Sequence, residues 1–322
     1  MTRQEALEQF TDEALPILEQ GEAAFSKALE SQAERLAETL KNIFFSLRHE
    51  AAGLEKEKLM FFHISILRTG ILRRTWQFTA QAMDARWYLD TEPAQIYFSL
   101  DFLFSAYDTV HEKLISDIRK YMGKVNSYDV EHLIEESVMK CNSILAQQTR
   151  YMLRDIEENE DFAAMEKTEV WSVYWGEYRD ACELVAYVNR EPKSQVEFER
   201  MLRQTKNKET SMIFSYWYNA NLKKINCEKK LLYFIQFENC DLKDIIFDSA
   251  VLTGARFKNC HIQNCSFKEA ELRQADFPDC VLEGNDFSGA DLENAVFAEQ
   301  KLPFLHLDAE QLQVILVDRG RS

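Results

Sequence analysis

Two carboxylate–imidazole pairs are the first candidates for metal chemistry in this 322-residue chain. Asp108 precedes His111 by three residues, and Asp129 precedes His132 by the same spacing. On a helix, each pair would lie on one face. Di-metal sites in helical bundles use Glu-x-x-His together with further glutamates that project inward. Here both pairs fall near predicted helix ends, beside a turn, where solvated polar residues are expected. We therefore expect no metal site and no cofactor.

Three of the seven cysteines, Cys141, Cys182 and Cys227, are candidate nucleophiles, because they lie outside the repeat described below. A catalytic thiol needs a base such as histidine close by in space, which the sequence does not place. Free cysteine more commonly behaves as a small buried apolar residue. The chain has no glycine-rich phosphate loop, no HExxH and no G-x-S-x-G motif. We predict no catalytic residues and a protein that is not an enzyme.

Four arginines concentrate positive charge on what the sequence predicts to be one helix: Arg68, Arg73, Arg74 and Arg86. They stand out because the chain as a whole carries a formal net charge of −16. They could bind an acidic partner or a phosphate group, or they could pair with acidic neighbours in the same chain. Both interpretations remain open, and the four residues are the candidate partner-binding site.

Composition and charge limit the class of protein. A chain with 46% hydrophobic and 29% charged residues is ordinary for a globular protein. No apolar run approaches the roughly 20 residues that span a bilayer, and the N-terminus is acidic, so we expect a cytoplasmic protein with reduced thiols. Long-range repulsion disfavours nucleic acid and anionic membranes as partners. A basic protein partner would suit this surface, and a homodimer is possible.

Residues 1–190 are predicted to form an antiparallel α-helical bundle. Apolar residues follow helical steps in five segments, for example Leu29 to Leu47, Leu59 to Tyr88 and Ile96 to Tyr121. Long helices joined by short turns favour antiparallel neighbours. Residues 191–230 are predicted to be a helical connector that docks on the repeat and covers its open first rung, because solenoids need capped ends.

Residues 231–307 carry an internal repeat of five residues, a period that is neither helical nor strand-like. A small residue stands two positions before most of the large apolar ones, and turn-forming residues follow them. A chain that turns a corner every five residues would point both apolar positions inward. After Leu232, the predicted core consists of Phe237, Leu242, Phe247, Leu252, Phe257, Ile262, Phe267, Leu272, Phe277, Leu282, Phe287, Leu292, Phe297 and Leu302.

Segments such as Ala250–Gly254 and Ser288–Ala295 resemble the pentapeptide-repeat family, whose units read A-(D/N)-(L/F)-x-x. That resemblance implies a short right-handed quadrilateral β-helix over residues 231–307, in which four units make one coil and positions twenty apart stack. Asp308 to Gln311 reads as a capping box, so residues 308–322 are predicted to be a C-terminal capping helix and tail. The predicted fold class is α+β and multidomain: the helical bundle, then the β-helix, then its cap.

Three functions follow as hypotheses. The first is a non-enzymatic protein–protein interaction or scaffold protein of bacterial type, with the β-helix as a rigid acidic platform. The second comes from the resemblance: some pentapeptide proteins, of the quinolone-resistance type, look like acidic duplex DNA and bind DNA gyrase. The third is an effector-like enzyme with a catalytic cysteine, because certain bacterial ubiquitin ligases join a similar β-helix to such a domain.

Overall fold

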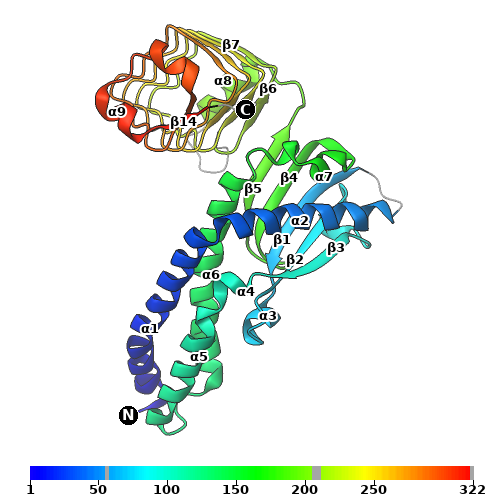
Figure 1. Cartoon of the computed structure of the whole chain (residues 1–322), viewed down its shortest axis with the longest axis vertical. Helices are drawn as coiled ribbons and strands as arrows, with labels where there is room; N and C mark the ends of the chain where they lie inside the picture. Colours follow the sequence, from blue (N-terminus) through cyan, green and yellow to red (C-terminus); the bar gives the residue numbers. More distant parts are fainter. Residues whose placement is uncertain (55–57, 205–211, 320–322) are drawn as a thin grey trace. The chain divides into compact units, whose positions relative to one another are not determined.

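The chain folds into two compact units, unit 1 over Met1–Tyr187 and unit 2 over Val188–Ser322. The computed structural model describes residues 1–54, 58–204 and 212–319 (Figure 1). Each unit is built around its own core, so each is described by itself.

Three helices of unit 1 pack together as an elongated group. They are α1 (Arg3–Ser31), α5 (Ala106–Asp117) and α6 (Ser127–Met152). Arg3 at the start of α1 pairs with Asp129 at the start of α6, so these two helices run in the same direction. Phe10 packs on Tyr121, which follows the end of α5, and the rings lie 5.6 Å apart. Helix α5 therefore runs antiparallel to α1.

A five-stranded sheet forms the other half of unit 1, in the order β3-β2-β1-β4-β5. Its strands are β1 (Leu59–Ile66), β2 (Gln77–Met83), β3 (Ala94–Ser99), β4 (Lys167–Glu177) and β5 (Cys182–Asn189). Strand β1 pairs antiparallel with β2 and parallel with β4, and β2 pairs antiparallel with β3. The prediction of an antiparallel α-helical bundle over residues 1–190 is therefore wrong for the segments that form these five strands.

The error has a physical cause in the burial of the central strands. Six of the eight residues of β1 and six of the seven residues of β2 are buried, so both faces of these strands are largely covered. A strand buried on both faces reads as a continuous apolar run without period-two alternation. Periodicity cannot distinguish such a run from a buried helix.

Helix α2 (Ala33–Ala52) crosses one face of the sheet (Figure 1). Phe44 of α2 and Phe62 of β1 both pack on Phe162 of α7 (Glu160–Ala164), with ring centres 5.2 and 5.0 Å apart. On α6, Asn142 accepts a hydrogen bond from Trp175 Nε1 of β4 at 2.8 Å. Short elements complete the unit: α3 (Arg68–Leu72), α4 (Asp101–Phe104), η1 (Trp87–Leu89), η2 (Ile118–Tyr121) and η3 (Ile156–Glu158).

Unit 2 is a stack of coils in which strand residues pair with the residues twenty positions later. One ladder joins β6 (Tyr216–Tyr218), β8 (Gln236–Glu238) and β10 (Arg256–Lys258). A second joins β7 (Asn221–Lys223), β9 (Asp241–Lys243), β11 (His261–Gln263) and β12 (Val281–Glu283). Isolated parallel bridges, such as Asn226 to Ile246 and Leu231 to Val251, form two further ladders.

The corners of the coils explain the turn-forming residues of the repeat. Every fifth residue from Phe214 to Gly289 has a φ between 50° and 70°, including Asn239, Ser249 and Gly254. Only glycine, and to a lesser extent asparagine and aspartate, adopt this left-handed region at low cost. The corner position of each unit is therefore under a backbone constraint.

The coils begin earlier than the sequence indicated. Met212, Trp217, Leu222 and Cys227 are fully buried and continue the five-residue register upstream of Leu232. Residues 212–230 are thus the first coil and not part of a helical connector. Helix α8 (Gln195–Gln204) is the cap, because its Phe198 packs edge-on against Trp217 with ring centres 4.7 Å apart. Residues 205–211 of the predicted connector lie outside the described residues.

The C-terminal end is closed by a short helix, α9 (Ala309–Val314), which follows β13 (Val296–Ala298) and η4 (Glu299–Phe304). Asp308 and Gln311 form a capping box, as the sequence predicted. Gln311 Nε2 also donates to the carbonyls of Phe287 and Ala290 at 2.8 and 3.0 Å. The chain then forms β14 (Leu316–Asp318), paired parallel with β13, where the sequence had indicated more helix.

The first coil predicts a large effect of Trp217→Ala. Because Trp217 is fully buried between Phe198 and Phe237, its truncation should lower the stability of unit 2 by about 3–5 kcal/mol. The measurement is hydrogen exchange of the β8 amides, which reports the free energy of opening. The exposed neighbour Lys223 is the matched control, and Lys223→Ala should change it by less than about 0.5 kcal/mol. Equal small effects would contradict a coil that starts at residue 212.

Candidate functional site

Arg68 lies at the start of α3 and is enclosed by carboxylates. It pairs with Glu177, and its Nε lies 3.1 Å from Glu135 Oε1 and its Nη2 3.5 Å from Asp180 Oδ2. The hydrogen bond and charge of Glu177 raise the pKa of Arg68 above its usual value. Of the two interpretations that the sequence left open, intramolecular pairing describes this arginine.

The four arginines do not share a helix. Arg73 and Arg74 follow α3, whereas Arg86 lies beyond the far end of β2. Arg86 Nε donates to Asp84 at 3.0 Å, and its Nη2 lies 3.6 Å from Asp90 Oδ1. Arg74 Nη1 lies 3.1 Å from His111 Nε2. The sequence grouped these residues because it took β2 for helix, and the strand separates them instead.

An open groove of about 590 Å³ lies beside Arg68 on the surface of α6. Its walls carry both signs of charge, because Arg68, Lys140, Glu135 and Glu136 all line it. Such a mixture selects neither an anion nor a cation. The groove therefore does not assign a ligand.

Three of the four residues in the carboxylate–imidazole pairs make ordinary polar contacts, whereas Asp108 Oδ1 is buried without a hydrogen-bond partner among the described residues. His111 Nε2 lies 2.9 Å from Glu131, and Asp129 accepts from Arg3 at 2.8 Å and takes part in the capping box of α6. His132 lies 3.5 Å from Glu136. Within residues 1–54, 58–204 and 212–319, no group of three or more His, Cys, Asp or Glu side chains is arranged to hold a metal ion.

The three candidate nucleophiles lie in different surroundings. Cys141 is buried on α6, 3.3 Å from the Tyr107 hydroxyl, and burial raises the pKa of its thiol to about 11. Cys227 lies inside the first coil, where burial raises its pKa to about 12. Cys182 on β5 is partly exposed and contacts Tyr88, and burial raises its pKa too. All three thiols stay protonated near neutral pH, which weakens them as nucleophiles.

An aromatic cluster around His63 was not foreseen from the sequence. His63 of β1 is 3% exposed and packs between the rings of Tyr88 and Tyr174, at 5.2 and 4.9 Å. Trp87 stacks on Phe61 at 4.3 Å on the same face of the sheet. Burial lowers the pKa of His63 to about 4, so the imidazole is neutral at physiological pH. The cluster is assembled by strand pairing, as in the register of His63 with Tyr174, so recognising the strands was the missing step.

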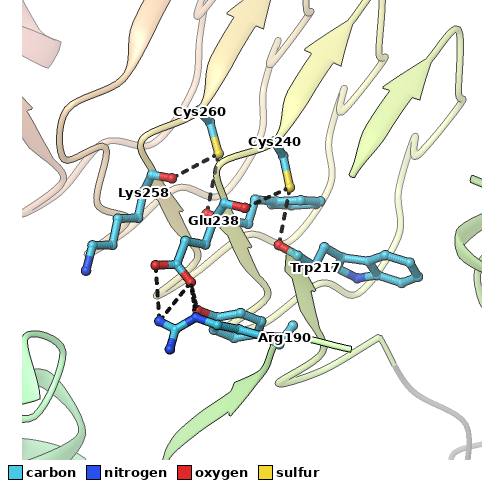
Figure 2. A network of polar contacts seen from close by, with 8 residues as sticks. Arg190, Trp217, Glu238, Cys240, Lys258 and Cys260 are labelled. Carbon is cyan, nitrogen blue, oxygen red and sulfur yellow. Dashed lines mark hydrogen bonds and ion pairs between the residues drawn. The ribbon is translucent and has the colours of Figure 1, made fainter. Parts of the chain in front are cut away.

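The start of unit 2 is fixed by a buried polar network (Figure 2). The Arg190 guanidinium lies against the carboxylate of Glu238, with Nη2 to Oε2 at 3.1 Å, and the Tyr216 hydroxyl donates to the same carboxylate. Lys193 Nζ donates to the Tyr216 carbonyl at 2.7 Å. These contacts hold the segment before α8 against the first two coils.

The interior of the coils is filled by stacked side chains. Phe257 and Phe277 stack at 4.9 Å, and Phe267 and Phe287 at 4.9 Å in a second column. Thiols form a third column: Cys240 Sγ donates to the Trp217 carbonyl at 3.2 Å, and Cys260 Sγ, one coil later, donates to the Phe237 carbonyl at 3.4 Å (Figure 2). Of the core residues named from the sequence, all are buried except Leu282 and Leu302, which are partly exposed.

Asn285 is the one polar residue at an inward position of the repeat from Ile235 to Ala295. Its Oδ1 accepts from the Cys265 amide and its Nδ2 donates to the Ile262 carbonyl, both at 2.9 Å. The amide side chain thus serves the backbone of the preceding coil. The side chains of the interior pack on one another or bind the backbone, and they are not arranged to bind a ligand.

The outer surface of the coils is ordered by charge ladders. Arg273 Nη1 lies 3.3 Å from Glu293, and Lys268 Nζ lies 3.1 Å from Asp286 on the next coil. His261 lies between Asp241 and Glu283, at 3.8 and 3.3 Å. Opposite charges one coil apart therefore fix the outer side chains, while the acidic residues remain in excess.

Comparison with known proteins identifies the repeat. Residues 232–307 match the family model for the pentapeptide repeat region. The region before residue 232 is not recognised by a family model, and no curated protein matches the chain. Among the described residues, no helix is long and apolar enough to cross a membrane.

Solved structures of pentapeptide repeat proteins resemble part of the chain. One is QnrB1, a plasmid-mediated fluoroquinolone resistance protein, with 21% identity, a TM-score of 0.24, and coverage of 27% of this chain and 50% of that one. Another is HetL, from the cyanobacterium Nostoc sp. strain PCC 7120, with 18% identity, a TM-score of 0.22, and coverage of 25% and 39%. A protein of the Arabidopsis thaliana thylakoid lumen gives 20% identity, a TM-score of 0.25, and coverage of 31% and 70%. The match thus spans half or less of the first two relatives.

The burial of His63 predicts a pH-dependent stability of unit 1. The pKa of His63 in the folded unit is about 4, below the ordinary value of 6.5. Between these two pH values, His63 is protonated in the unfolded chain but neutral in the folded unit. The contribution of neutral His63 to the free energy of unfolding is complete above pH 6.5. It is lost as the pH falls towards 4, by up to about 3 kcal/mol. Urea unfolding of the wild type and of His63→Phe measures the difference. His132→Gln, at an exposed histidine, should keep the wild-type dependence of the unfolding free energy on pH. An unchanged slope in His63→Phe would contradict the assignment.

The Arg190–Glu238 pair predicts a coupling that a double-mutant cycle can measure. Because Glu238 is buried, Arg190→Ala should lower the stability of unit 2 by about 1–3 kcal/mol. The double variant Arg190→Ala/Glu238→Ala should lose about 1–2 kcal/mol less than the sum of the two single variants. Hydrogen exchange of the β6 and β8 amides gives the values. Strict additivity would mean that the pair does not hold the segment in place.

Proposed function

We propose that this chain is a non-enzymatic protein–protein interaction or scaffold protein of bacterial type, in which the β-helix is a rigid acidic platform for a basic protein partner. The single observation that supports this proposal best is the filled interior of the coils. Columns of Phe, Leu, Ile, Cys and Ala occupy it without space for a ligand, so recognition by this part of the chain is left to its outer surface. We also propose that the coils form the right-handed quadrilateral β-helix of the pentapeptide family, and that the protein works in the cytoplasm.

Rigidity supports the role of a platform. Each coil is hydrogen-bonded to the next along its backbone, as in Leu252 N to Glu271 O at 2.8 Å and Phe267 N to Asp286 O at 2.7 Å. Helix α8 covers the first coil and α9 the last. A surface that does not rearrange loses little conformational entropy on binding.

The charge of the platform sets the class of partner. Residues 230–322 contain 9 Lys and Arg and 16 Asp and Glu, which gives a net charge of −7. Acidic surfaces steer basic partners towards encounter and repel acidic ones. A basic protein surface is therefore the partner that the platform favours.

Two other hypotheses stay outside this proposal. DNA mimicry requires a run of negative charge like that of a duplex, whereas here Lys268 and Arg273 lie among the acidic residues and pair with them. A gyrase supercoiling assay tests that alternative, and protection or inhibition of gyrase would favour it. The cysteine-enzyme hypothesis is disfavoured by the raised pKa values of Cys141, Cys182 and Cys227.

The proposal predicts charge-dependent capture of partners. Full-length chain, coupled to beads, is exposed to extract of its own source cells, and the retained proteins are quantified by mass spectrometry. The platform variant neutralises four exposed acids by Glu→Gln or Asp→Asn: Glu269, Glu271, Asp279 and Glu293. Retention of basic proteins by this variant should fall about tenfold, because each lost charge weakens steering and contact. Raising the salt concentration should have the same effect on the wild type.

A matched control neutralises four exposed acids of unit 1. They are Glu8, Glu19, Glu30 and Glu38. This variant has the same net charge as the platform variant, so retention that depends on the β-helix should survive in it. If both variants lose the same proteins equally, or if the wild type retains none above an uncoupled bead, the platform proposal is wrong.

A further inference from the structure

One side of the coil stack carries apolar side chains on its outer surface. We define the Leu232 side as the outward positions that flank the buried Leu232, Leu252, Leu272 and Leu292. Its early coils present Leu231, Tyr233 and Val251, of which Leu231 is 52% exposed. Parallel bridges from Leu231 to Val251, Val251 to Glu271 and Glu271 to Asp291 place these residues in one ladder. These apolar side chains point outward and so are not part of the filled core.

Two phenylalanines border this apolar area at the corner of the coil. Phe214 and Phe234, here called the aromatic ridge, stack with ring centres 4.9 Å apart and 4° between their planes. Both are partly exposed. Residue 254, the next position along this corner, is glycine, and a Cβ there would lie 2.3 Å from the Phe234 ring. The ridge is therefore accommodated by the coil above it.

The backbone of the aromatic ridge is in a costly conformation. Phe214 and Phe234 have φ values of 59° and 54°, at a corner where the later coils place Gly254, Gln274 and Asn294. A left-handed conformation costs a bulky residue about 1–2 kcal/mol. Strain of this kind concentrates at sites that bind or act. The ridge thus keeps two partly exposed aromatic rings at the surface in spite of this backbone cost.

The later coils of the same side are acidic. Glu271, Arg273, Asp291 and Glu293 occupy the outward positions, with a net charge of −2. Arg273 forms ion pairs with Asp291 and Glu293, the latter at 3.3 Å from Nη1, so its charge is paired within the same side of the coils. Along the axis of the stack, an apolar area is therefore followed by an acidic one.

We propose that the Leu232 side binds a single amphipathic α-helix of a partner protein. The apolar face of that helix lies on Leu231, Tyr233, Val251 and the aromatic ridge, and basic residues towards one end lie over Glu271 and Glu293. This inference rests on the proposed interaction function and adds the surface and the chemistry of the partner. Charge complementarity selects the basic helix, because an acidic or neutral one would leave the carboxylates without a counter-charge.

The dimensions of the side agree with one helix. Five corner residues from Phe214 to Asn294 follow one another at the strand spacing of about 4.8 Å, which gives a length of about 19 Å. An α-helix covers that length in about 13 residues and is about 10 Å wide. One side of a coil, with three extended residues, spans about 10 Å. A helix lying along the axis would therefore cover the apolar and the acidic areas together.

The probe is a displayed library of random 16-residue peptides, selected on the full-length chain. Enriched sequences should carry apolar residues at helical spacing, i, i+3 or i+4 and i+7, with Lys or Arg towards one end. The strongest peptide is then synthesised with a fluorescent label, and its Kd is measured by anisotropy. No enrichment, or enriched peptides without this pattern, would overturn the inference.

Variants of the side test where the selected peptide binds. Leu231→Ser/Tyr233→Ser should weaken binding at least tenfold, and Glu271→Lys/Glu293→Lys at least fivefold with a smaller salt dependence. The matched control is Val281→Ser, because Val281 is an exposed apolar residue on β12 of another side, 44% exposed. Its Kd should stay within twofold of the wild type. Hydrogen exchange of the β8 amides checks that each variant is folded. Equal Kd values for all variants would refute the site.

Failure of this inference can be separated from failure of the proposed function. If Leu231→Ser/Tyr233→Ser still captures the basic proteins that the charge-neutralised platform loses, then the platform proposal holds and the Leu232 side is not its contact. If both variants capture the same proteins as the wild type, both proposals are wrong. Loss in both variants, with retention in Val281→Ser, supports both.

Discussion

The stacking of identical positions twenty residues apart is the constraint on which unit 2 depends. Each backbone amide at a strand position finds its acceptor on a neighbouring coil, and each inward side chain finds its partner directly above or below. A single residue inserted in one coil would move every later inward side chain to an outward position. Core packing, the left-handed corners and the charge ladders outside all follow from this one register. Closure of both ends by α8 and α9 completes it, because an open coil would expose unpaired backbone groups.

Because the interior of the coils is filled, recognition by unit 2 is left to its outer surface. The inner positions admit only packing residues, and even Asn285 serves the backbone of the neighbouring coil. Residues that face outward have no such restriction. Departures from the expected polar surface are therefore informative. The aromatic ridge of Phe214 and Phe234 is such a departure, because the later coils place glycine or a polar residue at the same corner.

Unit 1 follows a different principle. Its sheet is covered on one face by α2, and the other face carries the aromatic cluster around His63. The candidate residues that the sequence singled out are mostly engaged in intramolecular contacts here: Arg68 with three carboxylates, Arg86 with Asp84 and Asp90, and Asp129 with Arg3. Charge in this unit therefore fixes loops and helix ends.

The sequence alone determined the repeat and its C-terminal capping box, because one residue in every five is constrained by its immediate neighbours in the coil. The stacking of positions twenty apart was implied by the resemblance to the pentapeptide family. It did not determine unit 1. The runs of β1 and β2 are apolar on both faces, so neither their strand character nor their pairing is encoded in a local period. The first coil was missed for a related reason, since Trp217 and Cys227 occupy positions that later coils give to Phe or Leu. Only tertiary packing, with α8 against Trp217 and β4 beside β1, decides where these segments belong.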